Sequence, residues 1–62
     1  MDERAYKRAK DLVIASNRVN PSEIQRRAGV NYYEAVEMVE RMEAEKLVSA
    51  PNATGKRKVL GQ

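Results

Sequence analysis

The hydrophobic positions in the N-terminal part of the chain follow the spacing of a helix. Apolar residues recur there at steps of three and four, namely Ala5, Tyr6, Ala9, Leu12 and Val13. This spacing places their side chains on one face of a helix. The pattern predicts a first helix over residues 2 to about 16.

A second helix is predicted over about 21–28 by the residues at its two ends. Asn20 can accept hydrogen bonds from the N–H groups of a first helical turn, Pro21 suits the first helical position, and Glu23 has capping-box spacing. Gly29 suits the position just past a helix end, where a positive φ costs glycine little. These ends predict a short helix followed at once by a tight turn.

A third helix is predicted over about 32–46. Asn31, with Glu34 three residues later, repeats the cap signal. The apolar stripe of this helix consists of Ala35, Val36, Val39, Met42 and Leu47. Tyr32 shares that face and is predicted to be buried, whereas Tyr33 is predicted to point into solvent. An exposed aromatic side chain is typical of an interaction surface.

The C-terminal residues predict a β-hairpin. Residues 47–50 and 56–60 flank a turn rich in Pro, Asn and Gly, and we expect them to form the two strands of a wing over about 47–60. Arg18-Val19 is a candidate for a short third strand.

These elements predict a single, mainly α domain over residues 1–62 with a small β-hairpin wing. Two short helices joined by a turn that contains Gly are typical of a helix-turn-helix. With the hairpin added, the predicted fold is a winged helix-turn-helix with three helices and a two- or three-stranded antiparallel sheet.

Composition narrows the function. The 62 residues include no His and no Cys, which excludes a disulfide framework, a thiolate zinc site and a His-based triad. Gly55-Lys56 lacks the first glycine of a P-loop at the required distance. We therefore expect a binding module and not an enzyme, with no catalytic residues, no metal site and no cofactor. The longest apolar run, Leu12 to Ala15, is far shorter than the ~20 residues that cross a bilayer, so we expect a cytoplasmic domain without membrane contact.

Charge is distributed unevenly along the chain. The formal net charge is +3, but residues 1–30 carry +3, residues 31–46 carry −3 and residues 47–62 carry +3. Phosphates would repel a third helix with a net negative charge. Nucleic-acid binders normally gain affinity from Lys and Arg, which neutralise phosphates and release the counterions bound to the nucleic acid. The basic segments on both sides of this helix can still supply phosphate contacts.

Contacts with DNA are predicted at Arg26, Arg27, Asn31, Tyr33, Glu34, Glu37, Lys56, Arg57 and Lys58. The second helix and the wing are expected to contact phosphates, and the third helix is expected to lie at the major groove. There a Glu can accept a hydrogen bond from cytosine N4, and Tyr33 can contact a sugar or a thymine methyl group.

Each of these residues also has a structural interpretation. Glu34 is suited to cap the third helix, and Glu37 precedes Arg41 by the four residues that favour an ion pair on a helix. The basic residues of the wing could protect an edge strand from aggregation, and Arg26-Arg27 could be a solvated face.

Several segments match a known family. They are Ala9 to Val13, Ile24-Gln25-Arg26-Arg27, Tyr32 with Ala35, Arg41 to Val48, and Lys58-Val59-Leu60. On these residues the chain resembles, over nearly its full length, the C-terminal gamma domain of the FtsK/SpoIIIE bacterial DNA translocases. The resemblance implies a winged-helix module that reads a short, oriented DNA sequence on the chromosome and contacts a tyrosine recombinase that resolves chromosome dimers. It also implies a bacterial or phage-encoded protein, with the ATPase in another part of a parent translocase.

The start of the third helix departs from the pattern of this family. Members typically carry Gly-Tyr-Asn-Arg-Ala-Ala-Arg there, with the Asn and both Arg on the DNA side. The matching stretch here is Asn31-Tyr32-Tyr33-Glu34-Ala35-Val36-Glu37. The resemblance therefore implies double-stranded DNA as the first expected partner, with altered sequence specificity.

A protein-interaction module is the alternative. In this hypothesis an acidic face binds a basic partner, such as a tyrosine recombinase or another DNA-processing protein. The face consists of Tyr33, Glu34, Glu37 and Glu40. Titration with random duplex DNA at two salt concentrations separates the hypotheses, because saturable binding that salt weakens favours DNA.

Overall fold

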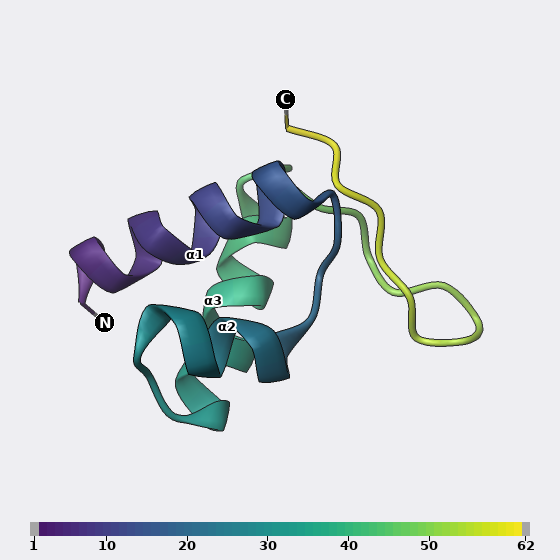
Figure 1. Ribbon diagram of the computed structural model, residues 1–62. Coiled ribbons are helices and arrows are strands. Elements are labelled where there is room, and N and C mark those ends of the chain that lie inside the picture. Colours follow the sequence, from purple (N-terminus) through teal and green to yellow (C-terminus); the bar gives the residue numbers. More distant parts are fainter. Residues whose placement is uncertain (1, 62) are drawn as a thin grey trace.

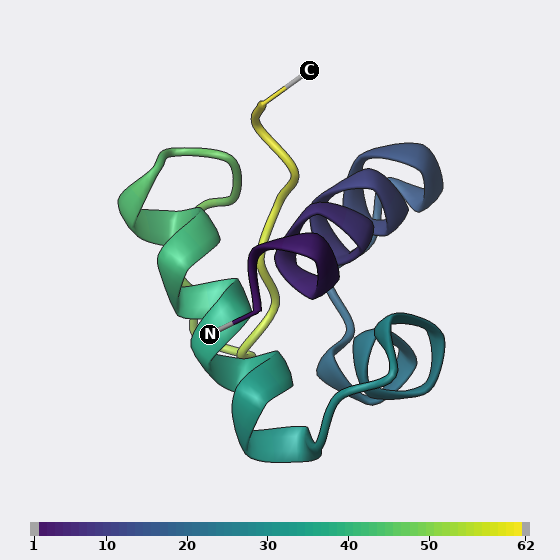
Figure 2. The ribbon, with the colours of Figure 1, turned by 90° about the vertical axis from the view of Figure 1, so that its left-hand side faces the viewer.

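The computed structural model describes residues 2–61 as three helices followed by an extended C-terminal segment (Figure 1). Helix α1 spans Glu3–Ser16, α2 spans Pro21–Ala28 and α3 spans Tyr32–Ala44. All three helices contact one another, with α3 on one side of the molecule and α1 and α2 on the other (Figure 2). The three predicted helices are confirmed, although α3 ends earlier than predicted. None of these helices is long and apolar enough to cross a membrane.

Polar caps fix where the helices begin. The Asp2 carboxylate accepts a hydrogen bond of 2.9 Å from an N–H group in the first turn of α1, and the Asn20 side chain does the same for α2 at 3.0 Å. Asn31 and Glu34 form a complete capping box at the start of α3. Because each cap satisfies N–H groups that have no partner inside the helix, it stabilises the helix start locally.

The core lies between the three helices and consists of Ala5, Tyr6, Ala9, Val13, Ile24, Ala28, Ala35, Met38, Val39, Met42 and Val48. The prediction that Tyr32 is buried is wrong, since this residue is 48% exposed. Side chains on a helix point toward its N-terminus. Because Tyr32 is the first residue of α3, its side chain extends beyond the N-terminal start of the helix and does not pack on the core.

Residues 47–61, named here the C-terminal arm, do not form the predicted wing. Val48 and Val59 make one isolated antiparallel bridge, and residues 2–61 contain no β-strand. Arg18-Val19 lies in the loop between α1 and α2. The predicted hairpin strands and the two- or three-stranded sheet are therefore wrong, and the described chain is all-α.

The hydrogen bonds that a longer hairpin needs are taken by other groups. The Leu47 N–H donates to the Met42 carbonyl at 2.8 Å, in the Schellman arrangement that closes α3. The Lys58 N–H donates to the Ser49 hydroxyl at 2.8 Å, while the Ser49 carbonyl accepts from the Arg57 guanidinium at 3.2 Å. In a regular antiparallel ladder the Lys58 N–H would donate to the Ser49 carbonyl across the two strands. Because both groups have other partners, the ladder ends after the single bridge.

Candidate nucleic-acid interface

A tight turn between α2 and α3 brings several of the predicted contact residues together. Gly29 makes the turn with a φ of +73°, a left-handed conformation that favours glycine. The last turn of α2 therefore lies beside the start of α3 (Figure 1). Arg26, Arg27, Asn31 and Tyr33 are all exposed there. We call the set Arg26, Arg27, Asn31, Tyr33, Glu34 and Glu37 the α2–α3 surface.

The predicted cations differ in how they are engaged. Arg26, Arg27, Lys56 and Lys58 are exposed, and the described part of the chain offers their side chains no ion pair. Arg57 is different, because its guanidinium pairs with Glu43 and its side chain is only 17% exposed. Four of the five predicted basic contacts are thus available to an external anion.

The carboxylates of α3 are less available than their number suggests. Glu34 accepts a hydrogen bond from the Asn31 N–H at 3.5 Å as part of the capping box. Glu43 pairs with Arg57 and Glu45 with Arg41. Within residues 2–61, Glu37 makes no ion pair, so the interpretation of Glu37 as the partner of Arg41 is wrong.

Two tyrosines mark the first turn of α3. Tyr33 is 79% exposed, as predicted, and Tyr32 is exposed beside it. Their rings meet edge to face, with centroids 6.4 Å apart. Because an aromatic ring can stack or contact a sugar, the pair gives this end of α3 a chemistry that a purely charged surface lacks.

An open hollow of about 400 Å³ lies between the α1–α2 loop and the C-terminal arm. Its lining residues are Asn17, Arg18, Val19, Asn20, Pro21, Gly55, Lys56 and Arg57. Arg18 pairs with Glu23 at 3.3 Å, and Arg57 pairs with Glu43. The net positive charge of the hollow therefore comes mainly from Lys56.

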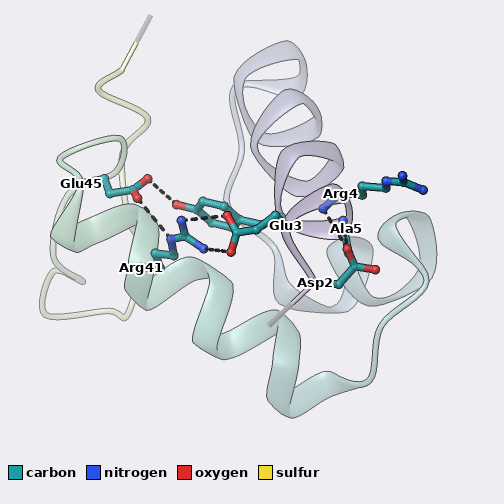
Figure 3. A network of polar contacts seen from close by, with 7 residues as sticks. Asp2, Glu3, Arg4, Ala5, Arg41 and Glu45 are labelled. Atoms are coloured by element: carbon teal, nitrogen blue, oxygen red, sulfur yellow. Dashed lines mark hydrogen bonds and ion pairs between the residues drawn. The ribbon is translucent and has the colours of Figure 1, made fainter.

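A second polar cluster, which we call the α1–α3 clamp, joins Glu3 and Tyr6 of α1 to Arg41 and Glu45 (Figure 3). The two guanidinium NH groups of Arg41 donate to the two carboxylate oxygens of Glu3 at 2.7 and 3.0 Å. The same guanidinium pairs with Glu45 at 3.2 Å and lies over the Tyr6 ring, 4.0 Å from its centroid. The Tyr6 hydroxyl donates to Glu45 at 2.6 Å. These charges satisfy one another.

The clamp shifts the titration of its members. The hydrogen bond from Arg41 holds the pKa of Glu3 below its ordinary value, and the hydrogen bond from Tyr6 does the same for the pKa of Glu45. Burial, followed by the contact with Glu45, raises the pKa of Tyr6. All three shifts stabilise the protonation states that the clamp requires at neutral pH.

The predicted contacts do not form one continuous patch. The α2–α3 surface lies at one side of Figure 1, and the loop of the C-terminal arm, which carries Lys56, projects from the opposite side. The sequence pattern did not indicate Glu43 as a partner of Arg57, nor the clamp as a whole, although Arg41 and Glu45 have the i,i+4 spacing of a helix pair. The partners Arg57 and Glu43 lie 14 residues apart, and Arg41 and Glu3 lie 38 apart, so no local spacing signals either contact.

Comparison with known proteins places the chain in a family. The family described as "Ftsk gamma domain" matches residues 1–62. The chain is 42% identical over 60 residues to the DNA translocase FtsK of Rickettsia typhi and 44% identical over 59 residues to that of Rickettsia bellii. It is 38% identical over 58 residues to the DNA translocase FtsK of Rhizobium meliloti. These alignments cover 97%, 95% and 94% of the chain but only 8%, 8% and 7% of the three relatives. The chain belongs to the FtsK gamma domain family.

Proposed function

We propose that this chain is a non-catalytic module that binds double-stranded DNA. The observation that carries the proposal is a set of exposed cations without an ion pair in the described part of the chain, namely Arg26 and Arg27 in the last turn of α2 and Lys56 and Lys58 in the C-terminal arm. The relatives are named DNA translocases, and DNA is the anionic polymer that such cations would meet. Since the chain spans less than a tenth of those relatives, the proposal covers DNA binding and not translocation.

In the proposed mode, the first turns of α3 approach the major groove. Arg26 and Arg27 contact phosphates beside it, as expected for two helices joined by a tight turn. Lys56 and Lys58 contact the backbone at a distance from the groove. The ion pairs of Glu43 with Arg57 and of Glu45 with Arg41 support this mode. They neutralise two carboxylates that would otherwise repel phosphate.

The first turns of α3 also support a specificity that differs from the family pattern. Tyr33 can contact a sugar or a thymine methyl group, and the unpaired Glu37 can accept a hydrogen bond from cytosine N4. Glu34 is held by the capping box with Asn31. A base contact by Glu34 would therefore compete with the start of the helix, so we assign base contacts to Tyr33 and Glu37.

The test is a titration of the chain with random duplex DNA at two salt concentrations. We expect saturable binding that weakens as salt rises. The variant K56A/K58A should bind all sequences more weakly and should show a flatter salt dependence, by roughly one unit of slope for each phosphate that the lysines no longer neutralise. The control R4A/K7A removes the same charge from exposed positions of α1 and should change the slope less. Equal slopes for the two variants would remove the arm from the mechanism, and no binding at low salt would overturn the proposal.

The exposed face of α3 supports a second candidate, contact with a basic protein such as a tyrosine recombinase. Tyr33 is 79% exposed, and Glu37 and Glu40 lie on the same side of the helix, exposed and without an ion pair in residues 2–61. Glu34 borders this face. Exposed aromatic residues are enriched at protein interfaces. Charge reversal in E37K/E40K should abolish capture of such a partner, and retained capture would exclude this face.

A further inference from the structure

The C-terminal arm presents its basic residues in alternation. From residue 56 to residue 60, exposed and half-buried residues alternate, with Lys56 and Lys58 exposed and Arg57 half-buried between them. Successive side chains of an extended segment point to opposite sides. Arg57 therefore lies on the inner side with Val59, which packs against the core, while the two lysines lie on the outer side.

Arg57 uses its guanidinium within the molecule. One nitrogen contacts both the carboxylate of Glu43, on the last turn of α3, and the carbonyl of Ser49, on the opposite segment of the arm, the latter at 3.2 Å. The side chain is only 17% exposed. A phosphate contact by Arg57 would have to displace a charge-assisted hydrogen bond that is already made.

The tip of the arm is held together by its own hydrogen bonds. The Asn52 side-chain oxygen accepts from the N–H groups of Thr54 and Lys56 at 2.9 and 3.0 Å. The backbone N–H of Asn52 donates to the Lys56 carbonyl at 2.8 Å. The tip can therefore move as a unit, and its orientation depends on the contacts at its base, where the single bridge and the Arg57–Glu43 pair lie.

We propose that Arg57 is a positioning residue, which through Glu43 orients the arm so that Lys56 and Lys58 face the DNA backbone. This inference rests on the proposed function and assigns Arg57 a different role from a direct phosphate contact. The proposal predicts a change in DNA affinity that is opposite in direction to the one ordinarily expected. Removal of a carboxylate near DNA ordinarily strengthens binding, whereas removal of the Glu43 carboxylate should weaken it, because the lysines lose their orientation.

The test compares E43Q with E40Q in DNA titrations over a range of salt. Glu40 is the matched control, since it lies one turn earlier on α3, is exposed and has no ion pair in residues 2–61. We expect E43Q to bind about three- to fivefold more weakly, the effect of losing one partly exposed ion pair, and to show a flatter salt slope although no cation is changed. E40Q should bind as tightly as the original chain or more tightly. Binding by E43Q that matches E40Q would overturn the proposal.

A second background separates positioning from general instability. In K56A/K58A the lysines that Arg57 is proposed to orient are absent, so adding E43Q should weaken binding no further. An equal weakening in both backgrounds would mean that Glu43 acts elsewhere, and it would overturn the proposal.

Amide hydrogen exchange measures the arm without DNA. In E43Q the amides of Ser49 and Leu60, which cross the arm to Lys58 and Leu47, should exchange several-fold faster, while the amide of Met38 in the core stays protected. If the original chain failed to bind duplex DNA, the proposed function would fall, and faster exchange would still identify Arg57 as the residue that orients the arm. Unchanged exchange in E43Q would overturn that role.

Discussion

The α1–α3 clamp and the α2–α3 surface use the same kinds of residue in opposite ways. In the clamp, Arg41 lies over the ring of Tyr6 and pairs with two carboxylates. On the surface, Arg26 and Arg27 have no ion pair within residues 2–61, and Tyr33 is 79% exposed. Charges and rings that satisfy one another stabilise the fold, whereas those left unsatisfied are available to a partner. The comparison therefore separates residues that hold the domain together from residues that bind.

The two tyrosines test this separation with the largest expected effect. Tyr6 is 1% exposed, so Y6A should lower the free energy of unfolding by about 3–5 kcal/mol, because it removes a buried ring and leaves a cavity. A domain of this size has little more stability than that, so Y6A should be largely unfolded. Y33A should change the free energy of unfolding by less than about 0.5 kcal/mol. Urea denaturation followed by circular dichroism measures both, and a Y33A variant as unstable as Y6A would contradict the comparison.

The clamp should also give the domain an acid limit of stability. The folded-state pKa values of Glu3 and Glu45 lie below the ordinary value of 4.5. Their stabilisation is therefore complete above pH 4.5 and is lost as the pH falls through the lowered values. Urea midpoints measured from neutral pH down to pH 3 should decrease once the pH is below 4.5. In E3Q the fall should be shallower, and an acid limb identical to that of the original chain would exclude Glu3 as its source.

The same clamp predicts an alkaline limit with the opposite sign. The folded-state pKa of Tyr6 is raised above its ordinary value of 10.0, so its contribution is complete below pH 10.0 and is lost as the pH rises through the raised value. In Y6F this part of the alkaline loss should disappear, because the ring remains but the ionisable hydroxyl does not. Y33F is the control and should retain the alkaline loss of the original chain.

Local signals predicted the helices, because their caps lie within a few residues of each helix. Asn20, Gly29 and Asn31 act within their own turns. The prediction of the C-terminal strands was wrong, because the groups that take their backbone hydrogen bonds have no clear signal in the sequence. The Schellman closure of α3 places Lys46 at a φ of +63°, a conformation that usually signals glycine. No glycine marked that closure, so the engagement of the Leu47 N–H by α3 could not be predicted.

The sequence predicted which residues of the candidate site are exposed better than it predicted their partners. Tyr33 and the basic pair on α2 lie in solvent as expected. The interpretation of Glu37 as the partner of Arg41 failed, because Arg41 pairs with Glu45, four residues after it, and with Glu3 of α1. The contact with Glu3, 38 residues away, is bidentate, a geometry that a single exposed helix pair lacks, and only the tertiary fold creates it.

A small effect on stability is expected for R26Q/R27Q, and this variant separates the two regions most cleanly. Both arginines lie in the last turn of α2, where a cation gains at most a modest interaction with the helix dipole. The free energy of unfolding should therefore fall by only about 0.5 kcal/mol, while the proposed DNA affinity falls and its salt slope flattens by roughly two units. R41Q should do the reverse, because Arg41 is engaged with Glu3, Glu45 and the Tyr6 ring. The urea midpoint of R41Q should fall. At urea concentrations below that midpoint, where the variant is folded, the salt slope of its DNA affinity should match that of the original chain. If each variant lowered both quantities alike, the distinction between charges that stabilise and charges that bind would not hold for this domain.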